Sequence, residues 1–117
     1  MNKIYYLSTC NTCKRILGEL ELPDDIALQE VKTEALTEAQ LDAMKALSGT
    51  YESLFNRRSQ LYRKQVLAEK SLSETDYRAL ILSHYTFLKR PVIIAGDKIF
   101  IGNSKKVVAA AKQAIHG

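Results

Sequence analysis

The sequence predicts one α/β domain, spanning residues 1–117, with a βαβ unit at its beginning, helices in its middle and a ββα unit at its end. Two observations predict this class. Apolar runs of strand length lie near both ends of the chain, and the segments that follow them carry apolar residues at helical spacing. A chain of this length suits one domain and buries a core without disulfides or a structural metal.

The first unit consists of two strands and a helix. Residues 3–7 are nearly continuously apolar, which favours a central strand covered on both faces. Residues 14–22 place apolar side chains at helical spacing, and Pro23 with the two aspartates behind it ends that helix. Residues 26–32 form the second predicted strand. This order favours two parallel strands joined by a right-handed crossover.

Helices are predicted for the middle of the chain. The first begins with a capping-box pattern, a threonine followed three residues later by a glutamine, and ends at a glycine. The last begins with a serine and an aspartate at the same spacing. The expected helices begin at Thr37, cover residues 59–67, and begin again at Ser73. We expect them to form a helical insertion over about residues 34–86, between the two parts of the sheet.

Two short strands and a helix end the chain. Residues 92–94 and 99–101 are apolar and flank a glycine–aspartate pair, which is typical of a tight hairpin. Asn103 or Ser104 is a suitable cap for a last helix, whose apolar residues lie on one face. The strands of this hairpin are expected to complete the sheet.

The charge balance indicates a solvated surface rather than a nucleic-acid interface. The chain has 17 Lys and Arg against 13 Asp and Glu, a formal net charge of +4, and no dense basic segment. No apolar run reaches the ~20 residues of a membrane helix. The first residues are too short and polar for a signal peptide. We therefore expect a cytoplasmic protein, in which cysteine pairs are more often catalytic or metal-binding than structural.

Cys10 and Cys13 lie between the first predicted strand and the first predicted helix, with Thr12 as a structural residue of the motif. The N-terminus of a helix presents free N–H groups and a partial positive charge, which lower the pKa of a thiol. Lys14 and Arg15 add positive potential. We expect Cys10, at the end of the loop, to be the nucleophile. Cys13, about one turn further on, is then the resolving thiol.

Two other interpretations of the cysteines stay open. A Cys-x-x-Cys pair is also half of a zinc site, but zinc needs about four ligands, and the remaining candidates are the widely separated His84 and His116. In the second interpretation both cysteines are buried apolar residues, but their polar neighbours Ser8, Thr9, Asn11 and Thr12 argue against it. His84 is either a proton shuttle or a hydrogen-bonded residue at a helix end. His116, next to the terminus, is expected to be disordered.

Several segments, in order and with fitting spacing, are similar to one family. Residues 6–15, YLSTCNTCKR, resemble the active-site start of the arsenate reductase/Spx family, and residues 88–94, LKRPVII, resemble its Arg-Pro strand entry. Arg58 lies in a segment that resembles an internal arginine-bearing segment, and His84 matches a recurrent histidine. The resemblance covers essentially the whole chain. It implies a thioredoxin-like (glutaredoxin-type) fold with a helical insertion, and a cis-proline at Pro91 that faces the cysteine.

The resemblance also implies that arginines hold the thiolate and its oxyanion, a task that suits forked and permanently charged guanidinium groups. Arg90 matches the arginine before the cis-proline. Arg58 matches a second arginine, with Arg57 as the alternative register. The third falls near Ile101, where this chain has an apolar residue. We therefore expect weak arsenate reduction or none.

Three functions are consistent with these residues. The one we favour is a thiol-dependent reductase that uses Cys10 and Cys13 on an oxidised sulfur or an oxyanion. For it, the resemblance implies glutathione, glutaredoxin or thioredoxin as electron donor, and a glutaredoxin-dependent arsenate reductase is its narrower form. Cys-x-x-Cys is also the pattern of Spx-type redox-sensing regulators, which implies RNA polymerase as partner. The third is a non-catalytic remnant. We expect no bound cofactor or metal and no direct contact with nucleic acid.

Overall fold

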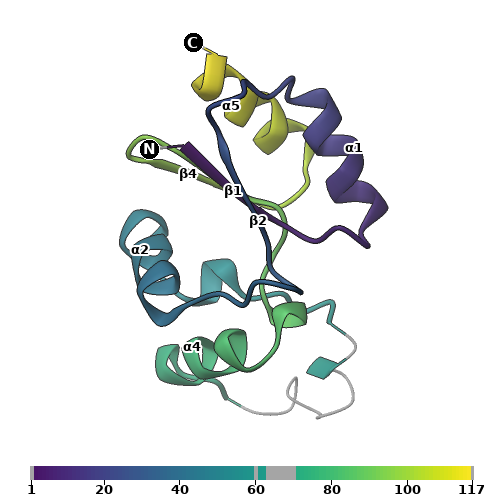
Figure 1. The fold of residues 1–117 in the computed structure, drawn as a ribbon. Helices are drawn as coiled ribbons and strands as arrows, with labels where there is room; N and C mark the ends of the chain where they lie inside the picture. Colours follow the sequence, from purple (N-terminus) through teal and green to yellow (C-terminus); the bar gives the residue numbers. More distant parts are fainter. Residues whose placement is uncertain (1, 60, 63–70, 117) are drawn as a thin grey trace. The chain divides into compact units, whose positions relative to one another are not determined.

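The structure is a computed structural model that describes residues 2–59, 61–62 and 71–116 (Figure 1). The chain divides into two compact units. Unit 1 contains residues 1–34 and 90–117, and unit 2 contains residues 35–89. No helix among the described residues is long and apolar enough to cross a membrane.

Unit 1 is built on a mixed sheet of four strands in the order β2-β1-β3-β4. The strands are β1 (Asn2–Tyr6), β2 (Ala27–Glu30), β3 (Val92–Ala95) and β4 (Lys98–Ile101). β1 pairs with β2 in parallel and with β3 in antiparallel, and β3 and β4 form the predicted antiparallel hairpin. The βαβ and ββα units predicted at the two ends of the chain therefore meet in one sheet.

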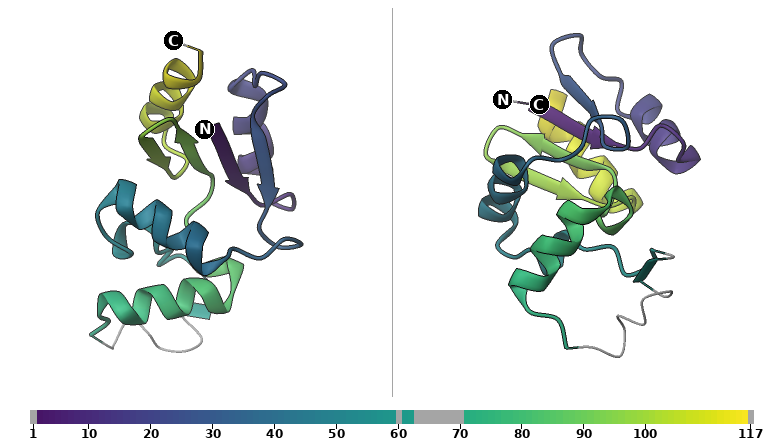
Figure 2. Two further views of the ribbon diagram at one scale, coloured as in Figure 1. Left: turned by 60° about the vertical axis from the view of Figure 1, so that its left-hand side comes forward. Right: turned by 60° about the horizontal axis from the view of Figure 1, so that its bottom comes forward.

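Two helices cover one face of this sheet, α1 (Asn11–Glu19) and α5 (Lys105–His116) (Figures 1 and 2). Ile4 of β1 and Ile93 of β3 are paired in register and contribute the sheet side of the core. The helices contribute further fully or nearly fully buried residues, which are Ile16, Leu20, Val108 and Ala111. Burial of each large apolar side chain of this kind stabilises the folded state by roughly 1.5–3 kcal/mol. The contacts of Ile16 and Leu20 therefore fix α1 on the sheet.

The central strand is covered on both faces, as its continuous apolarity predicts. Ile4 points to the helices and is fully buried, whereas Tyr5 points to the opposite face and is 4% exposed. β2 lies at the sheet edge, so its sequence needs less apolarity, and it is shorter than the predicted range of 26–32. In such a position only one side of the strand is paired.

Two expectations about the helices of unit 1 are wrong. The first helix begins at Asn11 and not at residue 14, because the segment counted as a turn already has helical backbone from Asn11 onward. His116 is not disordered: it lies in the last turn of α5, with its Nε2 2.7 Å from the carbonyl oxygen of Leu20. That contact joins the ends of the two helices.

Unit 2 contains the helices α2 (Glu38–Ser48) and α4 (Glu74–Ser83) and the short 3₁₀ helices η1 (Glu52–Leu54) and η3 (Tyr85–Phe87). Both predicted capping boxes are present, one at Thr37 and one at Ser73. Of the helix predicted over 59–67, Leu61 and Tyr62 are helical and Ser59 is not, whereas Gln60 and residues 63–67 lie outside the described residues.

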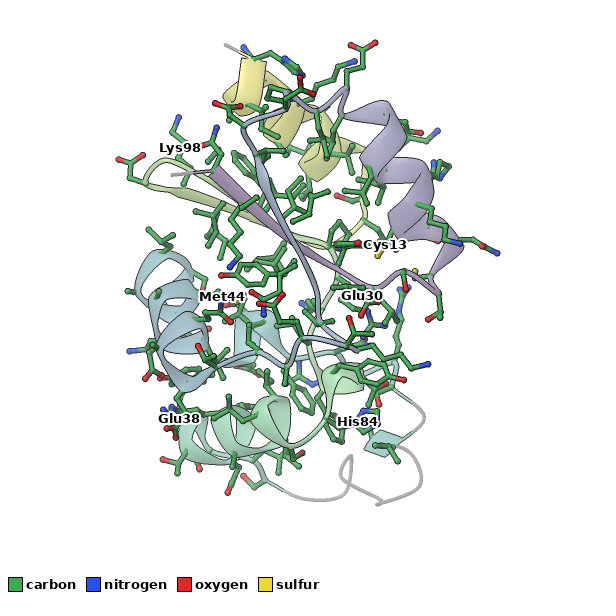
Figure 3. The ribbon with its side chains drawn as sticks, in the orientation of Figure 1. Cys13, Glu30, Glu38, Met44, His84 and Lys98 are labelled. Atoms are coloured by element: carbon green, nitrogen blue, oxygen red, sulfur yellow. The ribbon has the colours of Figure 1, made fainter. Side chains whose placement is uncertain are left out.

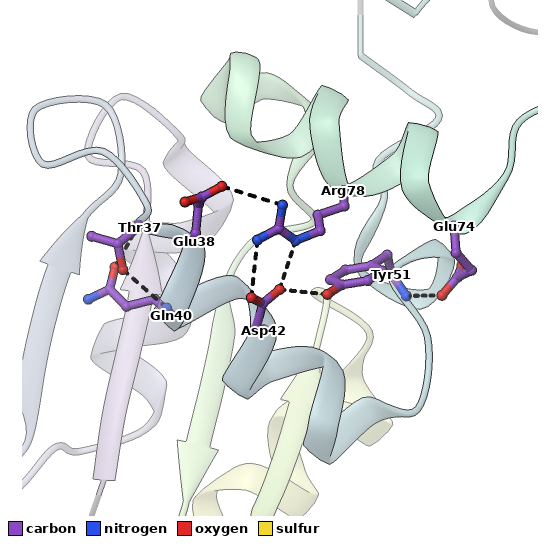
Figure 4. Close-up of polar contacts among 7 residues, drawn as sticks. All are labelled: Thr37, Glu38, Gln40, Asp42, Tyr51, Glu74 and Arg78. Carbon is purple, nitrogen blue, oxygen red and sulfur yellow. Dashed lines mark hydrogen bonds and ion pairs between the residues drawn. The ribbon is translucent and has the colours of Figure 1, made fainter.

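The core of unit 2 combines aliphatic side chains with a cluster of aromatic rings. The ring of Phe55 stacks on that of Phe87, with centroids 5.5 Å apart, and it also packs against Tyr77. On the surface, Arg78 of α4 donates two hydrogen bonds to the carboxylate of Asp42 on α2, which also accepts from the Tyr51 hydroxyl (Figure 4). This polar network joins α2 and α4.

Candidate active site

Cys10 stands at the junction of strand and helix in unit 1. β1 ends at Tyr6, and the chain then makes a tight turn in which the Cys10 N–H donates to the Leu7 carbonyl at 3.1 Å. Cys10 has extended backbone angles and occupies the N-cap position of α1, where its carbonyl accepts the first helical hydrogen bond from Lys14 at 3.1 Å. The sulfur of this residue is therefore at the positive end of the helix dipole.

Cys13 lies in the first turn of α1, on the face that packs into the core. It has no exposed surface, whereas Cys10 is partly exposed, and both are free thiols. The interpretation of both cysteines as buried apolar residues therefore fits Cys13 and does not fit Cys10. The pair has one accessible and one shielded sulfur.

The surroundings of Cys10 favour its thiolate. Partial burial alone would raise the pKa of the thiol. The N–H groups of Cys13 and Thr12, the Cys13 thiol and the positive charge of Arg90 outweigh that effect, and together they hold the pKa of Cys10 below its ordinary value. The Cys10 side chain makes no capping hydrogen bond with the described residues, and the positive end of the α1 dipole also favours its thiolate.

The surroundings of Cys13 favour its protonated form. Burial is the largest effect and raises the pKa of this thiol to about 11, with a further rise from the neighbouring Cys10 sulfur. The N–H of Leu7 and the charge of Arg90 act in the opposite direction but are weaker. The two thiols thus differ in the direction of their pKa shifts, because one is at the surface of the helix end and the other is inside it.

Arg90 and Pro91 precede β3, the strand beside β1. The Arg90–Pro91 peptide bond is cis, as the family resemblance implies. Tyr5 of β1 is paired in register with Val92, so Arg90 lies beside the end of β1 from which the chain leads to Cys10, and its positive charge acts to lower the pKa of both thiols. The Pro91 carbonyl accepts from the Gly102 N–H at 3.0 Å and so ties the start of β3 to the end of β4.

Ile101, where the resemblance leads one to expect an arginine, ends β4 and is paired in register with Val92. Its side chain is partly buried. Its partner Val92 is two residues after Arg90 along the chain. On β4, opposite the first residue of β3, the chain therefore has the apolar side chain of Ile101 and not the arginine that the resemblance implies.

Arg57 and Arg58 belong to unit 2. The Arg57 guanidinium is an ion-pair partner of the Glu52 carboxylate and donates to the Tyr77 hydroxyl at 2.8 Å, so its charge has local structural partners. Arg58 is exposed, and its main-chain N–H donates to the side chain of Asn56. Within unit 1 the structure brings Cys10, Thr12, Cys13 and Arg90 together, whereas the role of Arg58 stays a prediction.

His84 is the residue at which α4 ends and η3 begins. Its Nδ1 accepts from the Thr86 N–H at 3.0 Å, so the histidine caps the short helix. The contact favours the interpretation of His84 as a hydrogen-bonded helix-end residue. In the part of the chain that the structure describes, no group of three or more His, Cys, Asp or Glu side chains is arranged to hold a metal ion.

Glu30, at the end of β2, is a site residue that the sequence did not single out. Its side chain is labelled in Figure 3. One carboxylate oxygen accepts from the Ser8 N–H at 2.6 Å, in the turn that leads to Cys10. A general rule could have found it: the carboxyl ends of neighbouring parallel strands meet at one edge of a sheet, so a side chain that ends β2 lies beside the loop after β1.

The βαβ and ββα halves around a helix-capping cysteine define a thioredoxin-like protein with a thiol site. The model of the ArsC family matches residues 5–111, and the chain belongs to that family. An arsenate reductase of Haemophilus influenzae is 27% identical over 108 residues, which are 90% of this chain and 93% of the relative. Family and relative together support a thiol-based reductase.

Solved structures agree with this fold. A solution structure of an arsenate reductase related protein from Brucella melitensis is 27% identical and has a TM-score of 0.69, over 93% of this chain and 92% of that chain. An arsenate reductase structure from Vibrio cholerae has a TM-score of 0.75 over 94% of this chain and 96% of that chain. At 19% identity, the second likeness shows the fold alone.

Proposed function

We propose that this protein is a dithiol reductase in which Cys10 attacks the substrate and Cys13 resolves the product of that attack. The single observation that carries the proposal is the unequal environment of the two sulfurs. Cys10 is partly exposed at the helix N-terminus with a lowered pKa, and Cys13 is fully buried with a raised one. A nucleophile has to be ionised and accessible, whereas a resolving thiol has to be close and held in reserve.

For a disulfide substrate the reaction has two exchange steps. The Cys10 thiolate forms a bond to one substrate sulfur, and the other substrate sulfur leaves as a thiolate. The Cys13 thiol then loses its proton and attacks the Cys10 sulfur, which releases the second substrate thiolate and leaves a Cys10–Cys13 disulfide. The substrate gains two electrons, and the protein loses the same two.

For an oxyanion substrate the first step differs. The Cys10 thiolate displaces a hydroxide from the oxidised centre, and Arg90 balances the negative charge that gathers there. When Cys13 attacks the Cys10 sulfur, the electron pair of the bond between sulfur and that centre stays with the centre, which is thereby reduced. In both cases an external thiol, for which we propose glutathione or a glutaredoxin- or thioredoxin-type dithiol, reduces the protein disulfide.

The proposal is tested by alkylating the protein with iodoacetamide over a range of pH, with Cys13→Ser and Cys10→Ser as variants. Cys10 is expected to react with a midpoint below the ordinary thiol value of about 8.5. A substrate disulfide is expected to leave an intramolecular disulfide in the wild type and a stable mixed disulfide in Cys13→Ser. An unreactive Cys10, or a wild type that forms no internal disulfide, would contradict the proposal.

The identity of Ile101 gives a narrower expectation about the substrate. Several positively charged side chains around an arsenate oxyanion stabilise its negative charge. With isoleucine at position 101, this chain lacks one of the arginines that the resemblance implies. We expect measurable reduction of a small mixed disulfide of glutathione, and weak or no turnover of arsenate, when both assays contain glutathione and glutaredoxin. Arsenate turnover that equals or exceeds disulfide reduction would overturn this expectation.

A further inference from the structure

The carboxylate of Glu30 is held by main-chain N–H groups from two different segments of unit 1. Its Oε2 accepts from Ser8 at 2.6 Å, and its Oε1 accepts from Lys32 at 2.6 Å and from Thr33 at 2.9 Å. Ser8 is 22 positions away along the chain, whereas Lys32 and Thr33 form the turn that follows β2. One side chain therefore connects the turn after β2 with the turn after β1.

The connected turn is the one that presents the nucleophile. Ser8 follows Leu7, whose carbonyl accepts from the Cys10 N–H, and Cys10 in turn begins α1. The turn is therefore fixed at two points, at Ser8 by Glu30 and at Cys10 by Leu7. Without the first point, the main chain between Tyr6 and Cys10 has fewer restraints.

The Glu30 carboxylate is ionised under ordinary conditions. Desolvation opposes ionisation, but the N–H groups of Ser8, Thr33 and Lys32 and the Ser8 side chain outweigh it and lower the pKa of Glu30 to about 2. Hydrogen bonds from N–H groups to a charged carboxylate are stronger than those between neutral groups. The connection is thus present throughout the pH range in which Cys10 would react.

We propose that Glu30 is a positioning residue of the thiol site: its carboxylate holds the main chain of Ser8 and so sets where the Cys10 sulfur lies relative to the first N–H groups of α1. The inference rests on the proposed function, because it assigns Glu30 a part in the reactivity of Cys10. On this proposal Glu30 acts on Cys10 indirectly, through its hydrogen bond to the Ser8 main chain, and not through direct electrostatic interaction of its negative charge with the sulfur.

The test compares Glu30→Gln with Glu74→Gln. A glutamine at position 30 keeps the size of the side chain, but its NH₂ group cannot accept from one of the two sets of N–H donors. Glu74 is a matched control in unit 2, because its carboxylate also accepts from two main-chain N–H groups, those of Tyr51 at 2.7 Å and Glu52 at 3.1 Å. Both variants lose stability if the carboxylates are only structural.

The discriminating measurement is the pH profile of Cys10 alkylation in the folded protein. For Glu30→Gln we expect the midpoint to move to higher pH and the rate at about pH 7 to fall by about threefold or more, because the thiolate loses part of its stabilisation. For Glu74→Gln we expect the wild-type midpoint. If Glu30→Gln does not fold, Glu30→Asp serves instead, since it keeps the charge and can reach only one set of donors.

Each alternative result has a distinct meaning. A wild-type midpoint in Glu30→Gln, or an equal shift in Glu74→Gln, would overturn the role of Glu30 while leaving the dithiol proposal intact. A shift to lower pH would show that the charge of Glu30 acts on the sulfur directly, which also contradicts a positioning role. If the wild-type Cys10 itself has an ordinary midpoint and forms no disulfide, it is the proposed function that fails.

Discussion

Cys10 and Cys13 are separated by two residues, yet their sulfurs have opposite surroundings. The difference arises because Cys10 precedes the first turn of α1 and Cys13 lies on the core-facing side of that turn. The position of the pair at a helix end could be predicted from the sequence, because Cys-x-x-Cys lies between a predicted strand and a predicted helix, whereas its redox chemistry stays a prediction. The contact between Glu30 and Ser8, 22 positions apart, follows from no local pattern, and only the general rule that neighbouring parallel strands end at one edge of a sheet points to it.

Arg90 provides a direct test of the electrostatic account at this scale. We expect Arg90→Met to raise the pH midpoint of Cys10 alkylation, and to lower the rate at about pH 7 by about threefold, because it removes a positive charge that favours the thiolate. Arg90→Lys keeps a cation and is expected to retain most of the effect. The measurement is the alkylation rate of Cys10 between about pH 5 and about pH 9.

The control for this prediction is Arg15→Met. Arg15 lies on α1, is largely exposed and pairs with Glu19 at 3.3 Å, so its charge is screened by water and by its partner. We expect it to leave the midpoint of Cys10 almost unchanged. A midpoint that is the same in Arg90→Met and in the wild type would mean that Arg90 does not act on the sulfur.

Comparison of the predicted and observed ends of the helices and strands shows which ends the sequence signals define. The capping boxes at Thr37 and Ser73 were predicted correctly, because the signal lies entirely within four neighbouring residues. The start of α1 was placed three residues too late, because Cys10 is not among the usual capping residues and gives no such signal. The length of β2 was overestimated, since its end depends on pairing with β1 and not on its own composition.

The first capping box gives a prediction on stability. Thr37→Ala removes the side-chain oxygen that accepts from the Gln40 N–H at 3.1 Å, and we expect it to reduce the free energy of unfolding by about 1 kcal/mol. Thr37→Ser keeps the hydroxyl and should cost much less. Urea denaturation followed by circular dichroism measures both, and equal stability of the alanine and serine variants would exclude a contribution from the cap.

The whole molecule combines two units whose elements come from different parts of the chain. The ends of the chain build the sheet of unit 1, while the middle builds the helices of unit 2. The α/β class was predicted correctly, because apolar runs at both ends of the chain indicate strands, and the thioredoxin-like fold that the family resemblance implied is confirmed as well. The role of Arg58 stays a prediction, because this arginine belongs to unit 2 whereas the two cysteines belong to unit 1.

The stability of the whole protein is expected to fall in acid. Hydrogen bonds and the charge of Arg78 hold the pKa of Asp42 at about 2, and N–H groups do the same for Glu30, whereas the ordinary values are 3.8 and 4.5. A lowered pKa in the folded state adds stability above the ordinary value, and this stability is lost as the pH falls toward the folded value. The loss should therefore occur between about pH 5 and about pH 2.

Urea denaturation at a series of pH values measures this effect. We expect the midpoint urea concentration to decrease steadily below about pH 5, and to decrease less steeply in the double variant Glu30→Gln, Asp42→Asn, which is less stable at about pH 7. A wild-type midpoint that stays constant down to about pH 2.5 would contradict the role of these two carboxylates.

The complete burial of Cys13 also bears on how the protein withstands oxidative damage. A peroxide dissolved in water reaches the Cys10 sulfur first, since the other sulfur has no exposed surface. If the pair reacts as we propose, we expect the sulfenic acid formed there to condense with the Cys13 thiol to a disulfide, a form that an external thiol reduces. On the proposed function, the burial of Cys13 would therefore keep a reduced thiol available and protect Cys10 from oxidation to sulfinic acid, which is ordinarily irreversible.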